Sequence, residues 1–210
     1  MKNAVNYFED INIEVPYKYI YTRLGFRKGI TEINKNKKKE LDSVIEEAVL
    51  SIELKGCATI VPIERLTEDG VFLENGLVFK SKNLSKFLKD SISVVIMAAT
   101  SGKKIMNKIK NFSKENLEKG VIYDAVASEI TDSALDWIMN YYNQMLKREG
   151  KTLTQNRFSA GYGDLDLSNQ KKIYDLLDLK KIGIDITSDY ILIPEKSVSA
   201  IAGVKNILEK

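Results

Sequence analysis

The residues with the most chemical potential lie between positions 157 and 166, which read Arg-Phe-Ser-Ala-Gly-Tyr-Gly-Asp-Leu-Asp. Gly161 and Gly163 could let the backbone approach a ligand closely, because glycine carries no Cβ. Arg157 could bind a carboxylate or phosphate through two parallel hydrogen bonds, and Tyr162 could stack on a ring or face a cation. The segment could equally be a glycine-rich turn in which Tyr162 packs, and composition alone leaves both interpretations open.

Other candidate groups are carboxylates and one thiol. Asp124, Glu129, Asp132 and Asp136 lie along one predicted helix, where they form its solvated face or, alternatively, bind a ligand. The single thiol, Cys57, lies in an apolar segment typical of a buried strand. A thiol in such surroundings is expected to be inert rather than nucleophilic.

Several classes of function are excluded by what the sequence lacks. The 210 residues include no histidine, which removes Ser-His-Asp and Cys-His nucleophile systems, the zinc protease motif and most catalytic metal sites. Neither G-x-G-x-x-G nor G-x-x-x-x-G-K-[ST] is present. One cysteine excludes a disulfide framework, and no apolar run approaches the ~20 residues of a membrane span. Without a secretory signal at the N-terminus, we expect a cytoplasmic protein.

The charge of the chain argues against nucleic-acid binding. Lys and Arg number 32 against 29 Asp and Glu, a net charge of +3, whereas a nucleic-acid binder usually shows a larger and more clustered excess. One dense basic stretch, Lys35 with residues 37–39, reads as a solvated linker and helix start in preference to a phosphate-binding patch.

Two long elements are expected to position the candidate residues. Residues 91–100 form the most apolar run and predict a central strand buried on both faces. From Leu117 to Lys147, apolar residues recur every three or four positions, which predicts a long helix that Gly150 stops. Its predicted core stripe comprises Ile122, Val126, Ile130, Ala134, Trp137, Tyr141 and Met145.

Shorter elements complete the pattern, and they alternate irregularly with no clear linker. We therefore expect a single α+β domain over residues 1–210 rather than a doubly wound sheet. The shorter elements include a strand over 11–15, a loop over 30–38, a helix over 39–54, a basic helix through Ile109, a helix over 168–178 with Ser168 as N-cap, and final strands over 184–193 and 197–204.

Three segments resemble one protein family. They are Arg157 to Asp164, Ile182 to Thr187 (Ile-Gly-Ile-Asp-Ile-Thr) and Ile193 to Ala200 (Ile-Pro-Glu-Lys-Ser-Val-Ser-Ala). The R-x-x-x-G-Y motif, with P-x-K-S-V behind it, resembles the activation (S-adenosylmethionine-binding) domain of cobalamin-dependent methionine synthase. More narrowly, it resembles the short stand-alone form found in some anaerobic bacteria. Shorter pieces upstream extend the resemblance over most of the chain in order.

The resemblance implies a twisted, mainly antiparallel sheet flanked by long helices. It also implies that S-adenosylmethionine methylates cobalamin after an electron donor such as flavodoxin or ferredoxin reduces inactive cob(II)alamin. That methyl transfer moves no proton, so a chain without histidine can support it by positioning alone. The implied binding residues are Arg157, which grips the donor's carboxylate, Ala160, Gly161, Tyr162, Asp132 and Glu129, with no catalytic or metal-ligating residue.

The chain is too short to hold cobalamin, homocysteine and folate domains as well. The resemblance therefore implies an accessory subunit of a methyltransferase, with cobalamin carried by a corrinoid-bearing methionine synthase core subunit. Two alternatives stay open: a docking or capping module that binds no methyl donor, and a subunit that serves another corrinoid methyltransferase. Full-length activation domains continue beyond the S-V-S segment with a further ligand-contacting Tyr, which motivates the first alternative.

Overall fold

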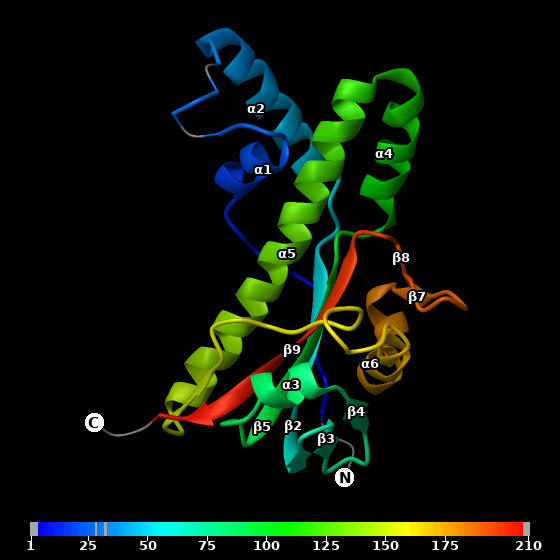
Figure 1. Cartoon of the computed structure of the whole chain (residues 1–210). Coiled ribbons are helices and arrows are strands. Elements are labelled where there is room, and N and C mark those ends of the chain that lie inside the picture. Colours follow the sequence, from blue (N-terminus) through cyan, green and yellow to red (C-terminus); the bar gives the residue numbers. More distant parts are fainter. Residues whose placement is uncertain (1–3, 28, 32, 208–210) are drawn as a thin grey trace.

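The computed structural model describes residues 4–27, 29–31 and 33–207, which form one α+β domain (Figure 1). In chain order its elements are β1 (Asn6–Phe8), α1 (Tyr17–Arg23), α2 (Lys35–Val49), β2 (Lys55–Thr67), β3 (Gly70–Leu73), β4 (Val78–Lys80), α3 (Lys82–Phe87), β5 (Ser93–Thr100), α4 (Lys103–Glu115), α5 (Leu117–Lys147), β6 (Lys151–Leu153), α6 (Asn169–Leu177), the 3₁₀ helix η1 (Leu179–Ile182), β7 (Asp185–Ile186), β8 (Leu192–Ile193) and β9 (Ser197–Asn206).

The main sheet has the strand order β4-β3-β2-β5-β9-β6, and β1 pairs with β2 beside this path. Every one of these pairs is antiparallel. β2 pairs with β5 as far as Pro62 and with β3 from Ile63 onward. The change of partner at Pro62 suits a residue that has no backbone N–H to donate.

β5 lies at the centre of the sheet and is buried along nearly its whole length. Val94 and Ile96 pack into the apolar cluster on one face, and Val95 and Met97 pack into the cluster on the other. This alternation follows from the pleat of a strand. The prediction of a central strand buried on both faces is confirmed.

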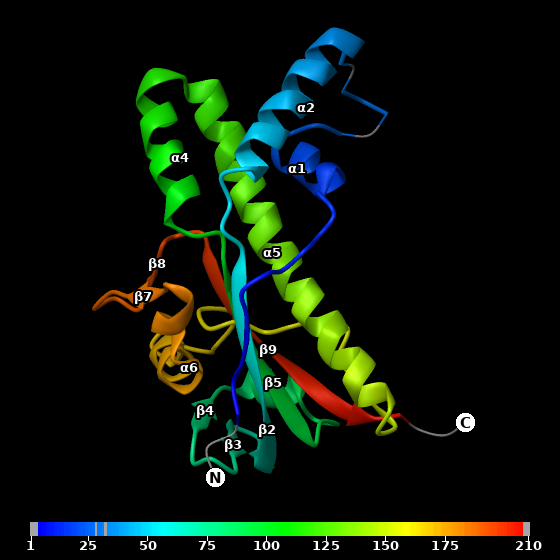
Figure 2. The same cartoon turned by 180° about the vertical axis from the view of Figure 1, so that it is seen from behind.

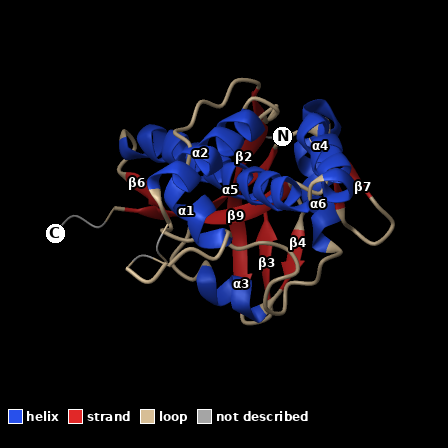
Figure 3. Ribbon diagram, turned by 90° about the horizontal axis from the view of Figure 1, so that it is seen from above, coloured by secondary structure: helices blue, strands red, loops and turns tan. Residues whose placement is uncertain are grey.

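Helices cover both faces of the sheet (Figures 1 and 2). α5 packs on one face, and α3, α6 and η1 pack on the other. The N-terminal half of α5 continues past the sheet, with α1 and α2 on one side of it and α4 on the other (Figure 3). No helix in the described ranges, α5 included, has the length and apolarity needed to cross a membrane.

The core stripe predicted on α5 is right in its N-terminal half and wrong in its C-terminal half. The first four positions, from Ile122 to Ala134, are buried, but Tyr141 is 38% and Met145 42% exposed. Trp137 is half-buried and packs edge-on against Phe8 of β1. A spacing of four residues drifts around a helix of 3.6 residues per turn, so neighbouring positions face the sheet instead. These are Leu135, Ile138, Met139, Tyr142 and Leu146.

The strand expected over residues 11–15 is wrong. The first strand, β1, lies earlier and pairs with β2. Ile11 is buried, and Ile13 and Val15 pack against the apolar clusters without strand partners. The alternation in the sequence therefore reflects packing, not pairing.

The bounds of two helices differ from the prediction. α2 begins inside the expected 30–38 loop, because Asn34 caps it by accepting a hydrogen bond from the Lys37 N–H (2.8 Å). It ends at Val49, before the predicted end at residue 54. α4 continues past Ile109 to Glu115. Residue 32 of the expected loop lies outside the described residues.

The C-terminal strands also differ from the prediction. The expected strand over 184–193 is wrong, because this segment forms the short β7–β8 hairpin apart from the main sheet. The last predicted strand is confirmed as β9, which lies between β5 and β6. Ser168 precedes α6 as predicted, but its side chain makes no capping hydrogen bond; its N–H donates to Asp166 Oδ1 (2.8 Å) instead.

Candidate functional site

A pocket of about 290 Å³ lies where α5 meets the loop between β6 and α6, the β7–β8 hairpin and the start of β9. These segments are far apart in the sequence, so the pocket depends on the tertiary fold. Its lining includes Asp132 and Leu135 of α5, Arg157, Ala160 and Tyr162 of the loop, and Tyr190, Glu195, Ser197 and Ser199 of the C-terminal segment.

Arg157 is turned toward α5 by the residue that follows it. Phe158 and Ile201 of β9 exchange two backbone hydrogen bonds, of 2.8 and 2.7 Å. Asp132 and Asp136 stand one helical turn apart on the same face of α5. Arg157 Nη2 donates to Asp132 Oδ1 (2.6 Å), and Nη1 donates to Asp136 Oδ1. Each terminal nitrogen of the guanidinium therefore already holds a carboxylate.

These carboxylates keep the partly buried Arg157 charged. The Arg157 side chain is 20% exposed, against 57% for Asp132 and 62% for Asp136. Burial is the largest single effect and lowers the pKa of the guanidinium, but the hydrogen bonds to Asp136 and Asp132 outweigh it and raise the pKa overall. With one cation and two anions, the cluster carries a surplus negative charge.

Gly161 bends the loop beside this cluster. Its φ of +86° is unfavourable for a residue with a Cβ, which explains the glycine. The Gly161 N–H donates to Leu165 O (2.8 Å), and the Leu165 N–H donates to Tyr162 O (3.0 Å). Leu165 is buried beneath this turn, and Ala160 is buried against the pocket. The bend places Ala160 and Tyr162 on the same cavity as Arg157.

Tyr162 stands at the rim of the pocket and is 69% exposed. Within the described part of the chain its hydroxyl has no hydrogen-bond partner. Arg157 and Tyr162 line one cavity, as the sequence predicted.

Asp164 faces away from the pocket and caps α3. It accepts hydrogen bonds from Ser81 Oγ, from the Lys82 N–H (2.8 Å) and from the Asn83 N–H (3.2 Å). These bonds, with the one from Ser81 foremost, lower the pKa of the Asp164 carboxyl. A Cβ on Gly163 would lie 2.6 Å from Asn83 Nδ2. The close approach at Gly163 is thus to α3, and this pair anchors the loop.

Glu129 is not brought to the pocket. It lies about one helical turn before Asp132 on α5 and forms an ion pair with Arg23 of α1 instead. The structure adds two residues to the set implied by the resemblance. Asp136, one of the four helix carboxylates noted in the sequence, is signalled by its spacing of four from Asp132, and no local pattern marks Glu195.

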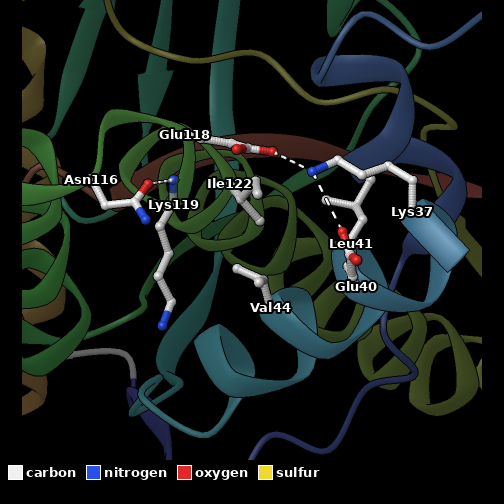
Figure 4. A pocket seen from close by; sticks show the side chains of 8 residues that line it. All are labelled: Lys37, Glu40, Leu41, Val44, Asn116, Glu118, Lys119 and Ile122. Atoms are coloured by element: carbon white, nitrogen blue, oxygen red, sulfur yellow. Dashed lines mark hydrogen bonds and ion pairs between the residues drawn. The ribbon is translucent and has the colours of Figure 1, made fainter.

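In two further hollows the lysine side chains have partners within the chain. Figure 4 shows a pocket of about 160 Å³ between α2 and the start of α5. Across it, Lys37 Nζ reaches Glu118 Oε1 (3.0 Å) and Glu40 Oε2 (3.6 Å), above the apolar side chains of Leu41 and Ile122 (Figure 4). This hollow is a seam between helices. The basic stretch at 35–39 forms the start of α2.

A larger groove of about 930 Å³ borders β1, the β3–β4 turn and α6. Its lysines have partners within the chain. Lys172 Nζ donates to Val78 O (2.6 Å) and Asn169 Oδ1 (2.8 Å), and Lys181 pairs with Asp178 (3.2 Å). Neither hollow combines a guanidinium, carboxylates and an exposed ring as the Arg157 pocket does.

The structure offers no metal centre or reactive thiol in its described ranges. No three acidic, thiol or imidazole side chains there are placed to hold a metal ion. Cys57 is buried, and burial raises the pKa of its thiol to about 12. The thiol is therefore inert at neutral pH, as predicted.

Comparison with known proteins finds a similar structure but no similar sequence. No protein-family model matches the chain, and no curated protein does. Among solved structures, a crystal structure of the MetH reactivation domain bound to AdoHcy matches with a TM-score of 0.65 at 13% sequence identity. The match covers 100% of this chain and 81% of that chain. The chain therefore has the fold of the MetH reactivation domain, which confirms the expected α+β architecture.

Proposed function

We propose that this chain binds S-adenosylmethionine and serves as the stand-alone reactivation subunit of a split cobalamin-dependent methionine synthase. The observation that carries the proposal is the Asp132–Arg157–Asp136 cluster, which shares one pocket with Tyr162. The fold supports it, because the similar MetH reactivation domain has AdoHcy bound, the demethylated form of this methyl donor.

The cluster fits the amino-acid end of such a ligand. An α-amino acid carries a carboxylate and an ammonium a few ångströms apart, and Arg157 beside an aspartate is the complementary pair. The ligand's carboxylate would take one Nη of Arg157 from Asp132 or Asp136. The released aspartate would then accept hydrogen bonds from the ligand's ammonium. The exchange breaks one ion pair of the cluster and forms two with the ligand, so the new pairs offset the cost of releasing the aspartate.

The openness of the pocket also fits this role. Its volume of about 290 Å³ lies just below the usual range of about 300–1,000 Å³ for ligand sites, so part of a bound ligand would stay exposed. A site that presents a methyl group to a second protein must remain open on that side. When bound, S-adenosylmethionine supplies an electrophilic methyl group for the partner's cobalamin. The residues of this chain bind and orient it, which makes the chain an accessory subunit rather than a complete enzyme.

The proposal requires two partners, a corrinoid-bearing methionine synthase core subunit and an electron donor such as flavodoxin or ferredoxin. We place the electron donor on α4. Lys103, Lys104, Lys110 and Lys114 are exposed there, and none forms an ion pair with any residue that the structure describes. Unpaired lysines attract an acidic partner at long range. A cytoplasmic location belongs to the same proposal, since the chain has no disulfide.

Calorimetric titration with S-adenosylmethionine tests the proposal. Arg157→Ala should weaken binding about 30-fold or more, because losing a partly buried charged pair costs about 2 kcal/mol or more. Arg148→Ala, which removes an exposed arginine at the end of α5, is the matched control and should leave the affinity within about two-fold.

Urea denaturation of each variant separates lost binding from lost folding. Arg157→Lys adds a variant that keeps the charge but cannot form two parallel hydrogen bonds. Wild-type heat that appears only at millimolar ligand, and is unchanged in Arg157→Ala, contradicts the proposal.

One observation favours a second function, docking on or capping a corrinoid protein without binding the methyl donor. Both terminal nitrogens of Arg157 already hold carboxylates of this chain, so a ligand has to compete with Asp132 and Asp136. In that case Arg157 only fastens the loop to α5. Pull-down of a corrinoid protein by a chain that gives no heat with S-adenosylmethionine supports this alternative.

A further inference from the structure

The Arg157 pocket contains a carboxylate that the guanidinium does not hold. Among the acidic and basic side chains that line it are Asp132, Arg157 and Glu195. Asp132, like its neighbour Asp136, is bound to Arg157. Glu195 is exposed to the pocket and forms no ion pair with any residue in the described ranges. It is therefore available to a cation that enters.

The backbone next to Glu195 is fixed in place. Lys196 Nζ reaches Asp124 Oδ1 and Ser128 Oγ of α5, both at 2.8 Å. The carbonyl of Lys196 accepts a hydrogen bond from the Ser101 N–H (3.0 Å). Lys196 thus reaches α5 while Glu195 lines the pocket. An anchored backbone reduces the conformational entropy lost when the Glu195 side chain meets a ligand.

The charge of the ligand gives Glu195 a role, and this step rests on the proposed function. S-adenosylmethionine carries a carboxylate, an ammonium and a sulfonium, whereas S-adenosylhomocysteine has lost the sulfonium charge with its methyl group. Arg157 and a released aspartate match the amino-acid end, which both molecules share. Arg157 keeps one aspartate and the ligand's ammonium takes the other, so Glu195 is the lining carboxylate that has no cation partner in the described ranges and can face the sulfonium.

We infer that Glu195 is a specificity residue, which makes the pocket prefer the positively charged methyl donor over its neutral demethylated product. The preference is electrostatic, because the donor carries a positive charge at sulfur and the product does not. Methyl transfer removes the cation that Glu195 attracts, so the product leaves while the amino-acid contacts are unchanged.

Glu195→Gln tests this inference, because it keeps the shape of the side chain and removes its charge. Calorimetry at low ionic strength should show S-adenosylmethionine binding weakened about five-fold and S-adenosylhomocysteine binding changed less than about two-fold. Glu74→Gln, at the β3–β4 turn outside this pocket, is the matched control and should change neither affinity. Raising the salt to about 0.5 M should reduce the wild-type preference, since exposed charges are screened.

The possible outcomes separate the inference from the proposed function. Equal weakening of both ligands in Glu195→Gln, or no change in either, overturns the inference and leaves the proposed function standing. A wild-type chain that binds neither ligand overturns the proposed function and the inference together. Loss of donor binding alone, with an unchanged unfolding transition, supports the inference.

Discussion

The Arg157 pocket and the exposed face of α4 both concentrate charge, but they organise it in opposite ways. In the pocket, Arg157 is partly buried between two carboxylates of the same chain. On α4, five lysines against one glutamate give a formal charge of +4, while the whole chain carries +3. No residue that the structure describes pairs with those lysines in a salt bridge.

The two arrangements of charge act over different distances. A partly desolvated ion pair has defined geometry, so it can select a small ligand in contact with it. Unpaired surface lysines add little to stability, but their field reaches about a Debye length, ~8–10 Å at physiological salt, and speeds association with an acidic partner. Substitutions in the pocket should therefore change stability and ligand affinity. Substitutions on α4 should change association rates.

The most direct test of this difference removes the two carboxylates that bind Arg157. Asp132→Ala with Asp136→Ala leaves a partly buried guanidinium without a counter-charge. Since both carboxylates are more than half exposed, we expect a loss of about 2 kcal/mol in the free energy of unfolding, less than for a fully buried pair. Urea denaturation measures it. The matched control, Lys103→Ala with Lys110→Ala, should stay within about 0.5 kcal/mol of wild type, and equal losses would contradict the comparison.

Charge reversal on α4 is expected to have the next largest effect. Lys103→Glu, Lys110→Glu and Lys114→Glu together should slow association with an acidic flavodoxin about ten-fold at low salt. Stopped-flow kinetics should show the difference shrinking as salt rises. The affinity for S-adenosylmethionine should stay within about two-fold of wild type. If the rate with flavodoxin is unchanged at low salt, α4 is not the docking face.

The smallest effect concerns the other anchor of the pocket loop. The pKa of Asp164 is lowered in the folded chain, chiefly by the hydrogen bond from Ser81, so the stabilisation is complete above the unfolded pKa of about 3.9. It is lost as the pH falls through the lower folded pKa. Wild type should therefore lose more stability than Asp164→Asn on acidification below about pH 4.

Denaturation curves at several pH values measure this effect. Asp189→Asn, an exposed residue in the β7–β8 turn, is the control and should follow wild type at every pH. Parallel pH dependence of wild type and Asp164→Asn would show that the cap on α3 does not depend on charge.

Much of the scaffold could be predicted from the sequence. The limits of α5 are confirmed at both ends, because Asn116 caps its start by accepting a hydrogen bond from the Lys119 N–H (3.0 Å) and Gly150 follows its end with a φ of +67°. The sequence also drew attention to the lysines at 35–39. There α2 places Lys37 in a seam with Glu118, whereas the exposed lysines of α4 form no ion pair with any residue in the described ranges.

The candidate site could be predicted only in part. The loop residues Arg157, Ala160 and Tyr162 lie on one cavity, as the segment pattern suggested. Asp132 and Glu129 are both candidates for the acidic residue on α5. The structure brings only Asp132 to Arg157. Spacing along a helix shows which carboxylates share a face, but it does not show which segment will pack against that face.

The long helix, the doubly buried strand and the glycine bend follow from local sequence, because caps, periodicity and positive φ act within a few residues. The pairing of Glu129 with Arg23 and the position of Glu195 on the pocket depend on how distant segments pack. Arg23 lies more than a hundred positions before Glu129, so their contact depends on how α1 packs on α5. Such pairings follow from the packing of whole elements, which no local pattern encodes.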